Sequence, residues 1–289
     1  MIYEVSHRTQ YDYDAAVTAS FAEIHQLPGD VDGQVCLRRL ITTDPASEYL
    51  RERLDYFGNL AAVVCIREPH TRLVVTTTSV IDTAGRPTEL GDHGRLPWQT
   101  YLAAESTDDD LMVLEFSLDS PVVARSAELA NFARASFGSG TTLADGVIGL
   151  CHRIHTDFVF DAEATDVDTS LADVLTIRKG VCQDFAHVMI GALRSLGLAA
   201  CYVSGYLETE PPTGKPRLIG VDRSHAWVNV HVGDGVWIGI DPANDQIAGA
   251  RYVSTARGRD YRDVPPLKGV IYTDSETSTL TVNVDVAPV

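Results

Sequence analysis

Long apolar stretches are absent from this chain. No run of about 18 apolar residues occurs, so no membrane-spanning helix is expected, and the start of the chain lacks the basic and apolar segments of a signal peptide. Basic residues are also scarce, since 23 lysines and arginines stand against 40 aspartates and glutamates, for a formal net charge of −17. Nucleic acids and anionic membranes bind clustered Lys and Arg, so neither is an expected partner.

Cysteine pairs and metal-binding motifs are missing as well. The five cysteines are odd in number and widely spaced, with no CxxC pair, which favours free thiols in a reducing cytoplasm. Neither HExxH nor a phosphate-binding glycine loop occurs. His152 and His155 have a helical spacing that metals use, but no third ligand is evident nearby, so surface or packing roles are favoured. No metal ion and no cofactor is expected.

The pattern of apolar residues changes near residue 120. Before this point, short runs rich in β-branched and aromatic residues are separated by turn signals, at 3–13, 35–42, 61–67 and 72–81. Beyond it, helical periodicity covers 129–137, 143–158 and 183–196, and strands are expected at 199–207, 226–232, 236–240 and 280–286. The chain is therefore predicted to be an α+β protein, with a β-rich domain over 1–120 and a second domain over 121–289. The acidic triplet 108–110 is expected to be a solvated turn.

Cys182 begins the third of these helical patterns. A helix N-terminus lowers the pKa of a thiol, and the free N–H groups of the first turn can stabilise an oxyanion. Gly180, two residues earlier, allows a tight turn and the close approach of a substrate. Cys182 is thus a candidate nucleophile whose own amide could donate to the oxyanion. A buried structural cysteine would explain the position equally well.

His225 and Asp241 lie on two expected strands joined by Gly233-Asp234-Gly235. If the loop is these three residues, residue 232 pairs with 236, and each pair of facing residues sums to 468. Asp241 then faces residue 227, with His225 as its diagonal neighbour on the same side, about 7–8 Å away between backbones. A two-residue loop would put them on opposite faces. An Asp so placed would fix the tautomer of the imidazole and stabilise its charged form.

Several segments closely resemble the bacterial branch of the transglutaminase-like superfamily. They are Gly180-Val181-Cys182-Gln183-Asp184-Phe185-Ala186-His187, Tyr202-Val203-Ser204-Gly205-Tyr206, Ser224-His225-Ala226-Trp227-Val228, Asp241-Pro242-Ala243-Asn244 and the β-rich first part with Asp55-Tyr56-Phe57-Gly58-Asn59. The resemblance implies a papain-like core with a Cys-His-Asp triad in this chain order, and so identifies Cys182, His225 and Asp241 as catalytic residues. One departure is Pro28-Gly29, where an Arg after the Pro would be expected.

The same resemblance implies a cysteine hydrolase that cleaves peptide or amide bonds in a peptide or protein substrate through a thioester acyl-enzyme, and the free cysteines favour the cytoplasm as its location. Two alternatives remain open at this point. The enzyme could transfer the acyl group to an amine, as a true transglutaminase, because both reactions share every step up to the thioester. The chain could also be a non-catalytic scaffold that binds peptides. The sequence leaves the oligomeric state open.

Overall fold

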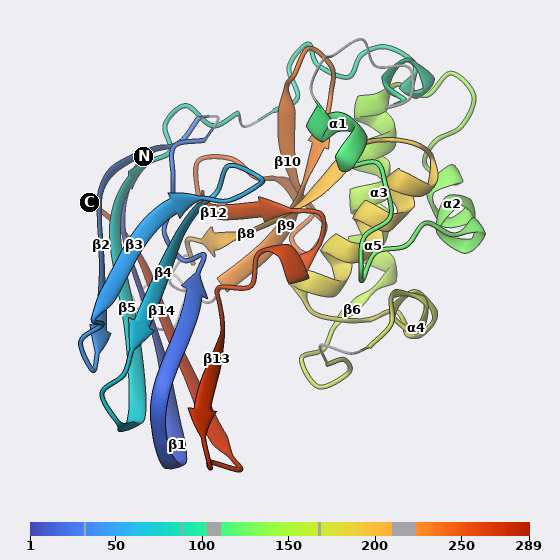
Figure 1. Ribbon diagram of the computed structural model, residues 1–289. Helices are drawn as coiled ribbons and strands as arrows, with labels where there is room; N and C mark the ends of the chain where they lie inside the picture. The colour runs from blue at the N-terminus through green and yellow to red at the C-terminus, as the bar shows by residue number, and fades with distance from the viewer. Residues whose placement is uncertain (32, 88, 103–110, 167–168, 210–223) are drawn as a thin grey trace, which may run out of the picture.

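Two antiparallel sheets organise the molecule, each in its own lobe (Figure 1). The computed structural model describes residues 1–31, 33–87, 89–102, 111–166, 169–209 and 224–289, so the acidic triplet 108–110 lies outside the described residues. One lobe consists of strands alone, and the other places helices against its sheet, which confirms the predicted α+β class. No helix in the described ranges has the length and apolar character needed to cross a membrane.

The first sheet has seven strands arranged around one long strand. Its order is β2 (Val35–Asp44), β5 (His70–Asp82), β1 (Ile2–Ile24), β4 (Leu60–Ile66) and β3 (Tyr49–Leu54), and β13 (Leu267–Thr273) and β14 (Ser278–Pro288) also pair with β1. The first half of β1 pairs with β5 and β14, and its second half pairs with β4 and β13. An ion pair between Arg39 of β2 and Glu52 of β3, 2.9 Å long, links the two ends of this order, so the sheet curls.

The last two strands belong to the first sheet by their hydrogen bonds. Residues 267–289 were expected within the second domain, but β14 pairs with β1 from Tyr3↔Pro288 to Tyr13↔Ser278. The chain therefore returns to the strand with which it starts, and both termini lie on the same side of the strand lobe (Figure 1). Apart from these two strands, the division of the chain into domains at residue 120 remains a prediction.

The second sheet carries the helices. Its order is β11 (Gln246–Ile247), β10 (Trp237–Asp241), β9 (Ser224–His231), β8 (Ala200–Leu207) and β12 (Tyr252–Gly258). The helices are α1 (Leu111–Glu115), α2 (Ala127–Arg134), α3 (Leu143–Asp157), α4 (Leu171–Ile177) and α5 (Cys182–Ser195), with 3-10 turns at Trp98–Tyr101 and Tyr261–Asp263 and a short pair of strands, β6 (Val159–Phe160) and β7 (Lys179–Gly180).

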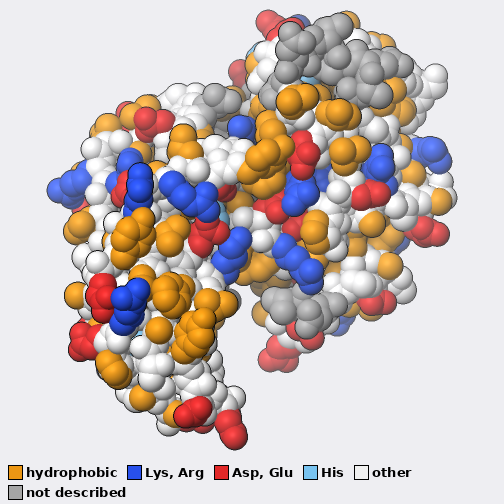
Figure 2. Space-filling view, in the orientation of Figure 1, with side chains coloured by type: hydrophobic (Ala, Val, Ile, Leu, Met, Phe, Trp, Pro, Cys, Tyr) orange, Lys and Arg blue, Asp and Glu red, His pale blue; other side chains and the backbone are white. Residues whose placement is uncertain are grey.

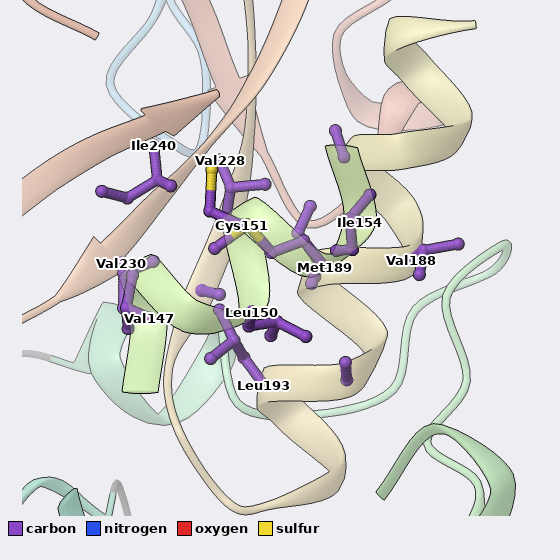
Figure 3. Close-up of a cluster of buried hydrophobic side chains, with 14 of the residues drawn as sticks. Val147, Leu150, Cys151, Ile154, Val188, Met189, Leu193, Val228, Val230 and Ile240 are labelled. Atoms are coloured by element: carbon purple, nitrogen blue, oxygen red, sulfur yellow. The ribbon is translucent and has the colours of Figure 1, made fainter. Parts of the chain in front are cut away.

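Helix α5 is buried because apolar side chains cover most of its surface. Met189 and Leu193 point toward α3 and the even-numbered residues of β9 and β10, and Val188 projects from the opposite side of the helix, as Figure 3 shows. Strand residues alternate across a sheet, so Val228, Val230 and Ile240 face the helices while Trp227 and Asn229 face away from them. This packing fixes where the first turn of α5 meets the start of β9.

Side-chain amides join the two lobes at β12, an end strand of the second sheet. Gln34 accepts from Ser254 N and donates to Ser254 O, both at 2.9 Å. Asn59 accepts from Arg257 N and donates to Arg257 O, both at 2.7 Å. Each amide thus takes the place that a neighbouring strand would occupy, and the strand lobe satisfies backbone groups that would otherwise be buried without partners.

Replacement of Gln34 by Leu is expected to destabilise the protein. Gln34 is only 1% exposed, so Gln34→Leu leaves the Ser254 N–H and C=O without these bonds in a dry site. The expected loss is about 1–3 kcal/mol of unfolding free energy, measured as a lower midpoint of urea unfolding. Asn131→Leu, at an exposed amide of α2, is the control and should change the free energy by no more than about 0.5 kcal/mol. Equal midpoints for the two variants would contradict this account of the lobe contact.

Candidate active site

Gly180 and Asp184 shape the first turn of α5. Oδ2 of Asp184 accepts from Val181 N at 2.8 Å and from Thr165 Oγ1 at 2.7 Å, so this carboxylate satisfies a free amide just before the helix. A Cβ on Gly180 would lie 2.4 Å from that same oxygen, which explains the glycine. Cys182 follows as the first residue of α5, and its side chain is half-buried.

The β9–β10 hairpin has the predicted register. The facing pairs run from Trp237↔His231 to Ile240↔Val228, and each sums to 468. The loop closes with Val232 N donating to Val236 O at 2.9 Å. Because the loop has an odd number of residues, His225 and Asp241 lie on the same face, and His225 Nε2 is 2.7 Å from Asp241 Oδ2.

The Asp241 carboxylate is fully buried and receives several donors. Oδ1 accepts from the N–H groups of Ala243 and Asn244 at 2.9 and 3.2 Å. Oδ2 accepts from Asn244 Nδ2 at 2.7 Å and from Tyr252 Oη at 2.6 Å, in addition to His225. Burial alone would raise the pKa of Asp241, but the hydrogen bonds and charge of His225, with the bonds from Asn244 and Tyr252, hold it below its usual value. Asp241 is therefore a stable anion beside the imidazole.

His225 lies between this carboxylate and Cys182. Burial alone would lower its pKa, but hydrogen bonds with Asp241 and Cys182 and the charges of both raise it to about 10. Since Asp241 occupies Nε2, the ring nitrogen left for the thiol is Nδ1. The rings of Trp227 and Tyr252 pack against the imidazole at centroid distances of 6.2 and 6.1 Å and restrict its rotation. The structure thus brings the three predicted residues together.

Helix α3 holds the loop that follows Asp241. The Cys151 thiol donates to Asp241 O at 3.4 Å, and Nδ1 of His155 lies 3.0 Å from Ala243 O. His152 Nδ1 lies 2.7 Å from Asp245 Oδ2. The two histidines therefore contact the loop that follows Asp241, and they do not share partners that could be metal ligands. Throughout the described ranges no three His, Cys, Asp or Glu side chains are grouped in a way that could hold a metal ion.

Sequence reasoning missed Tyr252 and Gln246. Gln246 Nε2 donates to Tyr252 Oη at 2.6 Å, and Tyr252 donates in turn to Asp241. Asn244 was part of the recognised Asp241-Pro242-Ala243-Asn244 segment, but no role was predicted for it. No periodic pattern marks Tyr252, because its contact with Asp241 depends on how β12 pairs with β8 on the far side of the sheet.

Comparisons with known proteins assign most of the chain to a family. The family model of the bacterial transglutaminase-like N-terminal region matches residues 3–82, and that of the transglutaminase-like superfamily matches residues 130–242. An uncharacterized protein of Mycobacterium tuberculosis is 40% identical over 99% of this chain and 92% of its own length. Another of Mycobacterium leprae is 32% identical over 98% of this chain and 97% of its own length.

A solved structure has the same fold over both lobes. The crystal structure of "a Putative Cysteine Protease from Cytophaga hutchinsonii" covers 98% of this chain and 90% of its own, with a TM-score of 0.72 at 19% identity. This likeness extends to the arrangement of the strand lobe with the helical lobe. The chain therefore belongs to the transglutaminase-like superfamily, in the bacterial branch with the transglutaminase-like N-terminal region, and its second lobe is the papain-like core of that family.

Proposed function

We propose that this protein is a cysteine hydrolase that cleaves peptide or amide bonds through a thioester on Cys182. The observation that carries the proposal is the 2.7 Å contact between His225 Nε2 and the buried Asp241 carboxylate, with the same imidazole hydrogen-bonded to Cys182. A thiol beside an imidazole and at a helix N-terminus is the arrangement that stabilises a thiolate.

The reaction starts from a thiolate on Cys182 and an imidazolium on His225, the pair that forms when the ring, with its pKa raised to about 10, takes the thiol proton. The thiolate attacks the carbonyl carbon of the substrate, and the Cys182 amide at the start of α5 donates to the oxyanion that forms. The C–N bond then breaks, and the imidazolium gives its proton to the leaving amine. Water, deprotonated by His225, attacks the thioester, which releases the carboxylic acid and returns the proton to the Cys182 sulfur. Asp241 stabilises the imidazolium in both halves of the cycle.

The proposed substrate is a peptide or protein, and the proposed compartment is the cytoplasm. All five cysteines are free, and Cys65, Cys151 and Cys201 are buried, so the chain depends on no disulfide. A reducing compartment would keep the Cys182 thiol available. The strong acidic excess of the whole chain, −17, favours substrates that are not polyanions.

Iodoacetamide labelling tests whether Cys182 is an activated thiol. Cys36 is the matched internal control, because it is half-exposed like Cys182 but burial raises its pKa. At pH 7, mass spectrometry should find Cys182 labelled at least about 10-fold faster than Cys36, since an ordinary thiol is only a few per cent ionised. Equal rates at the two cysteines would contradict the enzyme proposal and favour a peptide-binding scaffold.

Intact mass after incubation with a glutamine-containing peptide library and a primary amine distinguishes the two reactions of the thioester. Cleavage or deamidation by the wild type, absent from Cys182→Ala and retained by Cys36→Ala, is the expected result. Incorporation of the amine that needs Cys182 would instead identify a transglutaminase.

Asp241→Asn should move the alkaline limit of activity to lower pH. The folded pKa of His225, about 10, lies above its usual value of about 6.5. The imidazolium and its favourable contact with Asp241 are therefore fully present below about pH 6.5 and are lost as the pH rises through the folded value. Without the carboxylate, that loss should occur nearer neutral pH, with kcat/KM lower by about 10²–10⁴-fold. A profile with an unchanged alkaline limit would show that Asp241 does not act through His225.

Tyr252→Phe tests whether the Tyr252 hydroxyl positions Asp241. The variant keeps the ring that packs on His225 and removes the hydroxyl, which is the donor to Asp241 Oδ2 and the acceptor for Gln246 Nε2. We expect kcat to fall by about 10-fold, with KM nearly unchanged and the alkaline limit displaced. Tyr56→Phe, at an exposed ring of the strand lobe, is the control. A loss confined to KM would argue against a positioning role.

A further inference from the structure

A cavity of about 500 Å³ lies between the two lobes, away from the candidate active site. Asn229, Gly239 and Val203 form its floor on the face of the second sheet opposite α5, and turns of the strand lobe form its walls. None of Cys182, His225 and Asp241 lines it. The junction of two lobes is where proteins commonly bind small molecules, and this volume is within the usual range.

The cavity is lined by more basic than acidic residues, although the whole chain is acidic. Its lining contains three arginines, Arg39, Arg86 and Arg257, and one acidic residue, Asp30, whereas the whole sequence has 40 acidic and 23 basic residues. Arg39 is neutralised by Glu52 at 2.9 Å. Arg257 has no carboxylate partner among the residues that the structure describes, and its side-chain bond to Phe57 O is long, at 3.5 Å. Basic side chains also line the junction of the lobes in Figure 2.

The Arg86 guanidinium and the backbone of Arg257 are held in place before any ligand arrives. Asn59 fixes the backbone of Arg257 through its N–H and C=O. Arg86 Nη2 donates to Ser254 Oγ at 2.6 Å and to Gln34 Oε1 at 2.9 Å. The planar fork of an arginine matches the paired oxygens of a phosphate or a carboxylate, and a pre-organised fork loses little entropy on binding.

We propose that this cavity binds a small dianionic oxyanion, with Arg257 as its principal ligand, Arg86 beside it and the Asn229 amide as a donor from the floor. The shared chemistry is two negative charges on oxygens within one small molecule, as in phosphate or a short dicarboxylate. A bound dianion would contact both lobes at once, because Arg86 belongs to the strand lobe and Arg257 and Asn229 to the second sheet. The site is independent of the thioester chemistry proposed for Cys182.

Tryptophan fluorescence tests the site, because Trp237 lines the cavity. The full-length protein is titrated with inorganic phosphate and, separately, with malonate, at constant ionic strength held with sodium chloride. We expect a saturable change with at least one of the two dianions, accompanied by a rise in the midpoint of thermal unfolding. Saturation by phosphate alone or by malonate alone identifies which oxyanion the site prefers. No saturation with either would overturn the proposal.

Variants test which side chains bind the dianion. Arg257→Met should weaken binding at least 10-fold, while Arg95→Met, at an exposed arginine paired with Asp92, should bind like the wild type. Arg257→Met should fold, because Asn59 bonds only the backbone of residue 257. If it does not, Asn229→Leu replaces it and should also weaken binding. Unchanged affinity in a folded variant would overturn the assignment, and Cys182→Ala should bind as the wild type does whatever the outcome for catalysis.

Discussion

The buried carboxylate of Asp241 is the constraint around which the second lobe is arranged. An anion removed from water is tolerated only where donors surround it. Here the donors come from the imidazole of β9, the loop after β10 and the hydroxyl of Tyr252 at the start of β12. These segments meet only if the hairpin has its odd loop and β12 lies on the far edge of the sheet. Helix α5 then needs only to bring its first turn to His225.

The strand lobe supports this arrangement from outside. β12 carries Tyr252 at one end, and farther along it Ser254 and Arg257 bond to the amides of Gln34 and Asn59. A change in the position of the first lobe would therefore move β12, whose Tyr252 donates to Asp241. This link gives a physical reason why a domain without the candidate triad accompanies the papain-like core.

The candidate site was more predictable than the fold that surrounds it. The Cys182 turn and the β9–β10 register depend on short spacings, such as the three-residue loop at 233–235, and these are visible in the sequence. Tyr252 and the pairing of β14 with β1 were not predicted, because both join residues far apart in sequence or across a sheet, and no local pattern specifies such partners. Strand β3 was missed as well, because all six of its residues are exposed and the alternation that marks a strand is lost.

The closure of β1 by β14 has a consequence for synthesis on the ribosome. Residues 3–13 pair with strand residues 278–288, so one edge of β1 stays open while residues 14–277 are being translated. Strands with open edges can pair with other chains, and translation at about 5–20 residues per second leaves this edge exposed for many seconds. The curl of the first lobe and the charged strand β3 are the features that disfavour pairing with other chains until residues 278–288 emerge.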